Sequence, residues 1–226
     1  MLKLATQEQI NFYEKILYPM QDEIFSMMES DKFYLTGGTC LSRFYYHHRY
    51  SDDLDFFFLG NMFPKQDFEA EFNEIQKIIS KEFKTQLEIS SDYFKRLFVY
   101  KNDTALKIEF VYENFQTVKN PISKGKIFLD TKENILANKF SAIHGRKTVK
   151  DYFDLLFLLK EFSISQGIES SQLKQAPLNY EGAVLSLIGG NLEGIVYMIK
   201  EISESDFQTM RENLIKELLT YAKTIP

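Results

Sequence analysis

The amino-acid sequence predicts an α+β fold in which a mixed sheet with flanking helices is followed by an α-helical region. Two patterns predict it. Between residues 85 and 112, three strand-length stretches follow one another, whereas apolar residues from position 131 onward recur at helical spacing. The chain has 226 residues, of which 44% are hydrophobic, enough for a substantial core. We expect two domains, 1–130 and 131–226, with a substrate cleft that the helical domain closes.

The first domain begins with a helix and then alternates strands with helices. Apolar residues at helical spacing predict a helix over residues 7–30, which Pro19 kinks or divides because proline lacks the backbone donor. A short apolar run at 33–35 ends on Gly37 and Gly38, after which helical spacing resumes. The remaining elements expected in this domain are a strand over 53–59, a helix over 65–82, and strands over 85–90, 93–101, 104–112 and 127–129.

The second domain is expected to contain helices only. Their apolar spacing places them at 132–143, 148–162 and 204–222. The pattern between 163 and 203 is not assigned, and Gly189 and Gly190 interrupt it.

Charge and cysteine content narrow the class of protein. The formal net charge of −5 argues against broad coating of nucleic acid. The lone cysteine permits no internal disulfide, which is typical of a reducing compartment. The sequence shows neither a signal-peptide pattern nor an apolar run of membrane-spanning length, so we expect a cytoplasmic protein without membrane contact. Local basic clusters that a nucleic acid would need are Lys119, Lys124 and Lys126, and Arg146, Lys147 and Lys150.

Two carboxylates, Asp53 and Asp55, carry the main chemical signal. Residues two apart on a strand share a face, so both carboxylates can ligate the same pair of divalent ions. Two such ions stabilise the attacking and leaving oxygens of an in-line phosphoryl displacement. Glu109 is the candidate third ligand, because alternation over 106–110 places it on a polar face; its alternative is an exposed carboxylate paired with a lysine. We expect two Mg²⁺ ions here, with Mn²⁺ as a substitute.

Gly37, Gly38 and Thr39 supply a candidate phosphate-binding loop. Glycines let the backbone approach a triphosphate closely, and a following helix presents amides that favour an anion. Thr39 adds a hydroxyl that either binds phosphate or caps the helix. Gly-Gly and Asp-x-Asp are each unspecific alone; in this order, with a helix-sized gap between them, they indicate nucleotide chemistry.

Lys139 and Arg146 are candidate cations for the triphosphate. Lys139 lies in an otherwise apolar helix, and its alternative is a surface lysine whose ammonium reaches solvent. Arg146 follows Gly145 and either binds phosphate or caps the preceding helix.

Four further residues are expected to support the site. Arg49 and Ser51 precede the Asp53 strand and would brace the metal-binding loop, with the Ser51 hydroxyl also a candidate nucleotide contact. Asp151 either forms a capping box with Thr148 or supports the site. Asp154 lies beside core residues and needs a cationic partner, for which Lys139 or Arg146 is expected.

Two segments resemble the AbiEii/AbiGii toxin family of nucleotidyltransferases. GGTCLSRFYYHHRYSDDLDFFF is similar to the family signature Gly-Gly-Thr-x-Leu followed by Arg-x-Ser-x-Asp-Leu-Asp-Phe. ILANKFSAIHGRKTVKDYFDLLFLL is similar to its later helical motif through Lys139, Arg146, Asp151 and Asp154. Asp52 adds an acidic residue beside the metal pair, but alternation places it opposite Asp53 and Asp55. The matching positions of the first motif are Gly37, Gly38, Thr39, Leu41, Arg49, Ser51, Asp53, Leu54, Asp55 and Phe56.

The resemblance implies a polymerase-β-like nucleotidyltransferase core and transfer of a nucleoside monophosphate from an NTP to an acceptor hydroxyl, with release of pyrophosphate. It further implies a toxin of a bacterial toxin–antitoxin or abortive-infection system, with a cognate antitoxin and with tRNA or another RNA as acceptor. The alternatives are a nucleotidyltransferase that modifies a small molecule or a protein, and a non-catalytic NTP-binding module on the same fold.

Overall fold

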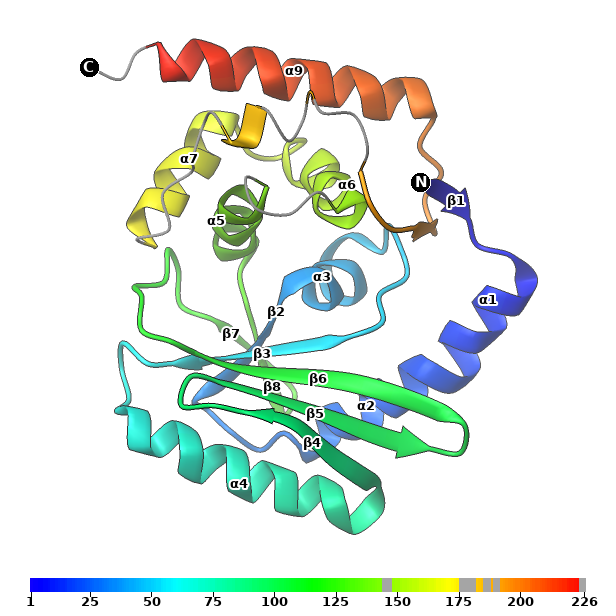
Figure 1. Ribbon diagram of the computed structural model, residues 1–226, viewed down its shortest axis with the longest axis vertical. Coiled ribbons are helices and arrows are strands. Elements are labelled where there is room, and N and C mark those ends of the chain that lie inside the picture. Colours follow the sequence, from blue (N-terminus) through cyan, green and yellow to red (C-terminus); the bar gives the residue numbers. More distant parts are fainter. Residues whose placement is uncertain (144–147, 175–181, 185–187, 189–191, 224–226) are drawn as a thin grey trace.

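A computed structural model describes residues 1–143, 148–174, 182–184, 188 and 192–223. Its centre is a seven-stranded mixed sheet in the order β4-β5-β6-β3-β2-β8-β7 (Figure 1). β3 runs parallel to β6 and antiparallel to β2, so the middle of the sheet joins segments far apart in the sequence. The strands are β2 (Phe33–Thr36), β3 (Leu54–Leu59), β4 (Lys84–Ser90), β5 (Phe94–Lys101), β6 (Thr104–Glu113), β7 (Ile122–Lys124) and β8 (Ile127–Leu129).

The N-terminal helical segment is divided near Pro19, as the sequence predicts. It consists of α1 (Gln7–Phe12), a π-helical turn η1 (Tyr13–Leu17) and α2 (Tyr18–Met27). Pro19 stands in the first turn of α2, directly after η1, and Leu17 and Tyr18 before it keep right-handed helical backbone angles, so the missing donor falls where the π-helical turn passes into α2. Thr6 begins α1 with a capping box to Gln9.

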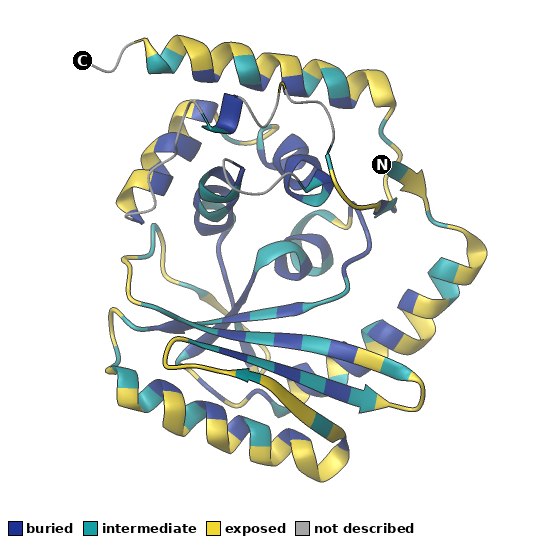
Figure 2. Ribbon diagram, in the orientation of Figure 1, coloured by how far each residue is buried: buried dark blue, intermediate teal, exposed yellow. Residues whose placement is uncertain are grey.

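The two faces of the sheet differ in chemistry. Phe56 and Phe58 of β3 point to one face and are almost fully buried, where Phe58 packs edge-on against Phe68 of α4 (Lys65–Glu82). Asp55 and Phe57 alternate with them and point to the opposite face. That second face lies beneath α3 (Gly37–Cys40), which continues into the π-helical η2 (Leu41–Tyr46), and beneath the C-terminal helices (Figures 1 and 2).

The C-terminal helices form a layer above the functional face of the sheet. They are α5 (Lys132–Ala142), α6 (Val149–Leu158), α7 (Ile164–Leu173) and α9 (Glu204–Ala222). α6 is buried along its length, including Asp151 and Asp154, which is unusual for carboxylates and marks the helix as part of a polar network (Figure 2). No helix within the described ranges is long and apolar enough to cross a membrane.

The expectation of helices only after residue 130 is wrong at one place. β9 (Val196–Met198) forms a parallel pair with β1 (Leu2–Leu4), so the beginning of the chain lies against the C-terminal region. A strand this short gains its hydrogen bonds from a segment almost two hundred positions away, which no local pattern reveals. Gly189 and Gly190 lie outside the described residues, and the division at residue 130 stays a prediction.

The other expected elements are confirmed, most of them to within a few residues. The helices predicted at 65–82 and 204–222 match α4 and α9. The Asn102-Asp103 turn joins β5 to β6, with Asn102 at φ 52°. α6 ends at Leu158, earlier than the predicted 162.

Asp130 joins the sheet to the first C-terminal helix. Its fully buried carboxylate accepts hydrogen bonds from the Thr36 hydroxyl at 2.5 Å and from the Asn134 side-chain amide at 2.7 Å. Burial raises the pKa of Asp130 to about 6, and nearby Lys174 partly offsets that rise. The same residue therefore ties the end of β2 to the first turn of α5.

We predict that Asp130→Ala lowers the free energy of unfolding by roughly 2–4 kcal/mol, because it leaves the Thr36 and Asn134 donors buried without their acceptor. Urea denaturation monitored by circular dichroism measures the change. Glu74→Ala, at an exposed position of α4, is the control and should change stability by less than about 0.5 kcal/mol. If Asp130→Ala lowered the free energy of unfolding no more than this control does, Asp130 would not stabilise the connection between β2 and α5.

Candidate active site

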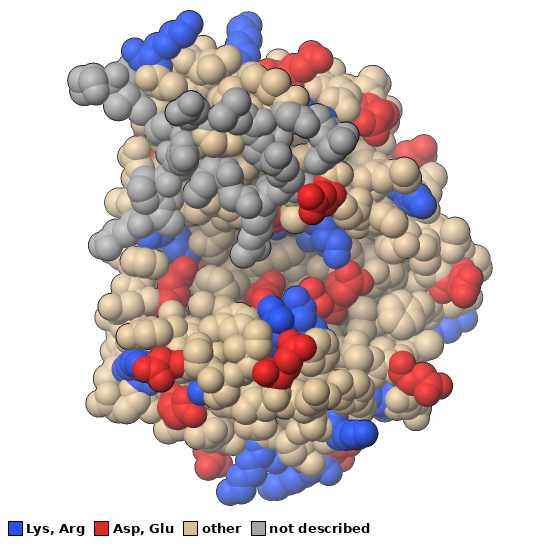
Figure 3. Space-filling model, viewed as in Figure 1, with Lys and Arg blue, Asp and Glu red and all other residues tan. Residues whose placement is uncertain are grey.

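A cleft of about 900 Å³ lies between the functional face of the sheet and the C-terminal helices. Figure 3 shows a hollow at the centre of one face of the molecule, where acidic and basic side chains lie side by side. Nearly all of the expected site residues within the described ranges line this cleft, together with others that the sequence did not single out. The lining includes Gly37, Gly38, Thr39, Arg49, Ser51, Asp53, Asp55, Glu109, Lys139 and Asp151.

The three expected metal ligands meet at the centre of the sheet. Asp55 of β3 is paired in parallel register with Glu109 of β6, so their side chains lie next to each other on the cleft face. Asp53 immediately precedes β3 and also lines the cleft. The sequence placed Glu109 on the same face as the aspartates, and the register confirms that placement.

Cations neutralise part of this carboxylate cluster. The Lys107 ammonium lies 3.1 Å from Asp53 and 3.3 Å from Glu109. The Arg96 guanidinium, on β5, donates to Glu109 at 2.8 Å and to Glu88 at 3.1 Å. Burial, together with the Glu109 and Asp53 carboxylates, raises the pKa of Asp55 to about 6, and nearby Lys107 and Lys139 offset only part of that rise.

The donor set fits a divalent cation in its chemistry. Three carboxylates crowd together, and the pKa of Asp55 is raised first by burial and then by the Glu109 and Asp53 carboxylates. Within the described ranges, no group of three potential ligands is already gathered around one point. Asp53 and Glu109 form ion pairs with Lys107 and Arg96, so their carboxylate oxygens face these cations and not one common point.

The glycine loop lies directly beside these carboxylates. Gly37 has φ 69°, and a Cβ there would lie 2.6 Å from an oxygen of Asp55. A Cβ on Gly38 would lie 2.1 Å from the Arg49 guanidinium. Only glycine leaves room for both approaches, so the motif is explained by contacts within the chain as well as by any contact with phosphate.

Thr39 and Ser51 connect the loop to the strand that carries the aspartates. The Thr39 hydroxyl lies 2.9 Å from the Ser51 hydroxyl and also donates to the backbone carbonyl of Asp53. Thr39 is buried and does not cap α3, whose N-cap, Thr36, makes no side-chain capping bond. These bonds fix the position of Asp53 relative to Gly37 and Gly38.

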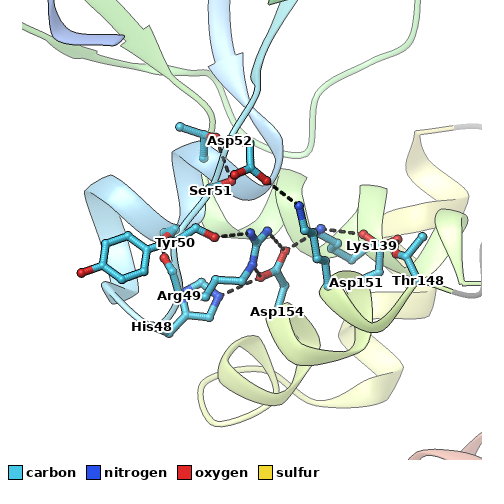
Figure 4. A network of polar contacts seen from close by, with 12 residues as sticks. His48, Arg49, Tyr50, Ser51, Asp52, Lys139, Thr148, Asp151 and Asp154 are labelled. Atoms are coloured by element: carbon cyan, nitrogen blue, oxygen red, sulfur yellow. Dashed lines mark hydrogen bonds and ion pairs between the residues drawn. The ribbon is translucent and has the colours of Figure 1, made fainter. Parts of the chain in front are cut away.

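A buried ion-pair network connects the loop before β3 to the C-terminal helices (Figure 4). Arg49 donates to both carboxylate oxygens of Asp154, at 2.7 and 3.0 Å. The Lys139 ammonium lies 2.6 Å from Asp154 and 2.7 Å from Asp151. His48 approaches Asp154 at 2.8 Å and stacks on Phe153. The expected Lys139 partner of Asp154 is observed, and Arg49 is a second cationic partner of the same carboxylate. The role of Arg49 in bracing the metal-binding loop stays a prediction.

The charges of this network balance one another. Burial alone would raise the pKa of Asp154, but Arg49 and Lys139 outweigh it and hold that pKa well below its usual value. Burial lowers the pKa of His48, so this imidazole adds no further positive charge near neutral pH. Two cations therefore face two anions, Asp151 and Asp154, and removing any one of them would leave a buried charge unpaired.

Asp151 has a different local role from the expected capping box. The Thr148 hydroxyl donates to the Asp151 carboxylate at 2.5 Å, and α6 has no side-chain cap. The Asp151 carboxylate prefers Lys139 to the helix amides because a nearby full charge attracts it more strongly than a backbone dipole. Arg146 lies outside the described residues, so its expected phosphate contact stays a prediction.

Sequence reasoning missed several lining residues. Lys107 stands two positions before Glu109 on the same strand, so the two side chains share the cleft face. That spacing was the signal that could have identified Lys107. Lys174 is almost fully buried, bonded to Glu113 at 2.9 Å and to Asn138 at 2.8 Å, and it falls in the segment that had no assignment. Asp52 accepts from Lys150 at 2.7 Å and from the Tyr13 hydroxyl at 2.5 Å, and it lines the same cleft as Asp53 and Asp55, because β3 and its alternation begin only at Leu54.

Solved structures share this fold. The chain resembles JHP933 from Helicobacter pylori with a TM-score of 0.60 and 18% identity, over 99% of this chain and 98% of that one. It resembles the nucleotidyltransferase toxin MenT4 from Mycobacterium tuberculosis H37Rv with a TM-score of 0.60 and 12% identity, over 95% and 90%. These similarities show a nucleotidyltransferase fold, which confirms the expected fold class.

Sequence relatives identify the family. The uncharacterized protein aq_aa25 of Aquifex aeolicus (strain VF5) is 30% identical over 142 residues, and the match covers 62% of this chain and 64% of that protein. The model of a family described as "Nucleotidyl transferase AbiEii toxin, Type IV TA system" matches residues 27–220, which include both the carboxylate cluster and the Arg49–Asp154 network. The chain therefore belongs to the AbiEii nucleotidyl transferase toxin family.

Proposed function

We propose that this chain transfers a nucleoside monophosphate from an NTP to an acceptor hydroxyl, with the help of divalent metal. The observation that carries the proposal is the position of the glycine loop. Gly37 lies against Asp55, which is paired in register with Glu109, so a triphosphate on the loop would reach the carboxylate cluster. Family membership supports the same chemistry.

Asp53, Asp55 and Glu109 are the residues that would hold the metal, Mg²⁺ or Mn²⁺. Bound there, two such ions would supply charge neutralisation at the phosphates and lower the pKa of the attacking hydroxyl. The acceptor oxygen forms a bond to the α-phosphorus while the bond to the β-phosphate oxygen breaks, and pyrophosphate leaves. Gly37 and Gly38 admit the phosphates close to the backbone, and the Thr39–Ser51 bond keeps the loop in register with Asp53.

Lys139 is the proposed cation for the triphosphate. Lys139 lines the cleft, and its ion pairs with the Asp151 and Asp154 carboxylates fix the position of its ammonium. Arg49, shared between Asp154 and the loop beside Gly38, couples this cation to the phosphate loop. Positioning of this kind reduces the entropic cost of reaching the transition state.

RNA is the proposed acceptor, and a cognate antitoxin is the proposed partner, both on the basis of family membership. Three lysines of the expected basic clusters are paired with carboxylates in the structure. Lys119 is paired with Glu133 at 2.6 Å, Lys126 with Glu29, and Lys150 with Asp52 at 2.7 Å. An RNA would therefore have to displace these carboxylates, and a tightly restricted contact near the cleft fits the net charge better than broad binding.

Incubation with each α-phosphorus-labelled NTP, Mg²⁺ and total tRNA tests the proposal directly. We expect label on RNA from the wild type and a loss of at least about a thousandfold in Asp53→Ala/Asp55→Ala, because charge neutralisation at the phosphates is lost. The Asp31→Ala variant, at an exposed position, is the control. Label found on protein and not on RNA would show that the acceptor is a protein. Label found on an added pool of metabolites would show that the acceptor is a small molecule. NTP binding without any transfer would favour the non-catalytic module.

Expression without a cognate antitoxin tests the toxin role. We expect induction of the wild type to slow bacterial growth, and the Asp53→Ala/Asp55→Ala variant at matched protein level to leave growth unchanged, because toxicity requires transfer. Growth curves and viable counts measure the effect. Equal growth of both induced strains, at confirmed expression, would count against a toxin.

The raised pKa of Asp55 predicts a pH-dependent stability. An acid whose pKa is raised from 3.8 to about 6 in the folded state destabilises the fold when ionised, so the penalty is full above about pH 6 and declines as the pH falls toward 3.8. In a metal-free buffer, Asp55→Asn should raise the Tm by about 2–4 °C near pH 7.5, and much less near pH 4. Differential scanning fluorimetry measures both values, with Asp31→Asn as control. An equal change at the two pH values would contradict the assignment.

A further inference from the structure

Lys107 is placed inside the carboxylate cluster, and the motifs of the sequence assign it no role. Its ammonium lies 3.1 Å from an Asp53 oxygen and 3.3 Å from a Glu109 oxygen, so it bridges two of the three proposed metal ligands. Its side chain is 29% exposed and lines the cleft. A cation bridging two carboxylates holds the same kind of position that a divalent ion would take.

Arg96 also contacts the cluster but is held differently. Its Nε and a terminal nitrogen both lie 2.8 Å from one Glu109 oxygen, and another terminal nitrogen donates to Glu88 at 3.1 Å. The planar guanidinium is thus fixed between two carboxylates on neighbouring strands. Lys107 carries a compact charge at the end of a flexible four-carbon chain, so it can leave the cluster while Arg96 stays in place.

We propose that Lys107 is an exchangeable counter-ion of the metal site, which balances Asp53 and Glu109 in the metal-free protein and must leave them when a divalent ion binds. This inference rests on the proposed metal-dependent function. It explains why three carboxylates stand together in the described structure without being gathered around one point. Lys107 is a positioning residue in this scheme: it keeps the ligands on the cleft face and sets how strongly a metal must compete for them.

An ordinary surface ion pair is the alternative for Lys107. Such pairs contribute little to stability when both partners are exposed to solvent. Asp53 is 41% exposed, but the Glu109 side chain is only 17% exposed, and its neighbour in register is a third carboxylate, Asp55. Removing Lys107 therefore leaves three close carboxylates with less counter-charge, which favours a divalent ion over an empty cluster.

Titration of the purified full chain with Mn²⁺ alone, followed by electron paramagnetic resonance of free Mn²⁺, tests the inference. Lys107→Met should bind Mn²⁺ about tenfold more tightly than the wild type, because the competing charge is gone. Lys107→Arg keeps the charge and should bind within about threefold of the wild type. Lys101→Met is the matched control on the same hairpin, since Lys101 pairs with Glu23 and lies over the Phe83 ring and is not among the residues that line the cleft. Lys107→Gln replaces Lys107→Met if the latter does not fold.

The outcomes separate the inference from the proposed function. Tighter binding in Lys107→Met or Lys107→Gln, with Lys107→Arg and Lys101→Met near the wild type, supports the exchangeable counter-ion. Wild-type binding that is lost in Asp53→Ala/Asp55→Ala but is equal or weaker in Lys107→Met overturns the role of Lys107 and leaves the metal site intact. Absence of Mn²⁺ binding in the wild type and in Lys107→Met alike overturns the metal site, and the inference with it.

Discussion

The buried pairing of Arg49 with Asp154 is the interaction on which the rest of the site depends. It joins the loop before β3 to α6, residues 105 positions apart, through two hydrogen bonds to one carboxylate. Breaking one partner of a buried pair leaves an uncompensated charge, which costs several kcal/mol. Lys139 shares Asp154 and extends the network to α5 (Figure 4). The sheet that carries the carboxylates and the helices that carry the cation are therefore held in one relative position.

Two charge clusters of opposite character lie on the two sides of the cleft. On the helical side, Arg49 and Lys139 balance Asp151 and Asp154, and the low pKa of Asp154 reflects that balance. On the sheet side, the carboxylates of Asp53, Asp55 and Glu109 lie together, and burial with the Glu109 and Asp53 charges raises the pKa of Asp55 to about 6. A balanced cluster stabilises a fold, whereas an unbalanced one stores repulsion that a bound cation relieves. This difference distinguishes the structural ion pairs from the candidate catalytic centre.

The glycine motif illustrates how structural and functional requirements coincide. Asp55 approaches the backbone of Gly37, and Arg49 approaches that of Gly38, so closely that a side chain at either position would collide with them. Glycine is therefore required at both positions by contacts within the chain. The same lack of side chains is what a phosphate-binding loop requires. Asp130 adds a second constraint at this point, since it fixes the end of β2, from which the loop departs, to α5. Loop, carboxylates and Lys139 are thus positioned by contacts that exist before any substrate binds.

The sequence by itself determined most of the helices and sheet strands and the identity of most candidate site residues. Helical and strand periodicities follow from local side-chain spacing, and the Gly37–Asp55 motif is contiguous enough to be recognised in one segment. Tertiary structure alone decided which residues meet. The β1–β9 pair, the bridging position of Lys107, and the burial of Lys174 against Glu113 all depend on contacts between distant segments. Long-range contacts have no local signature, because the spacing of residues along a chain fixes a face but not the partner that packs against it.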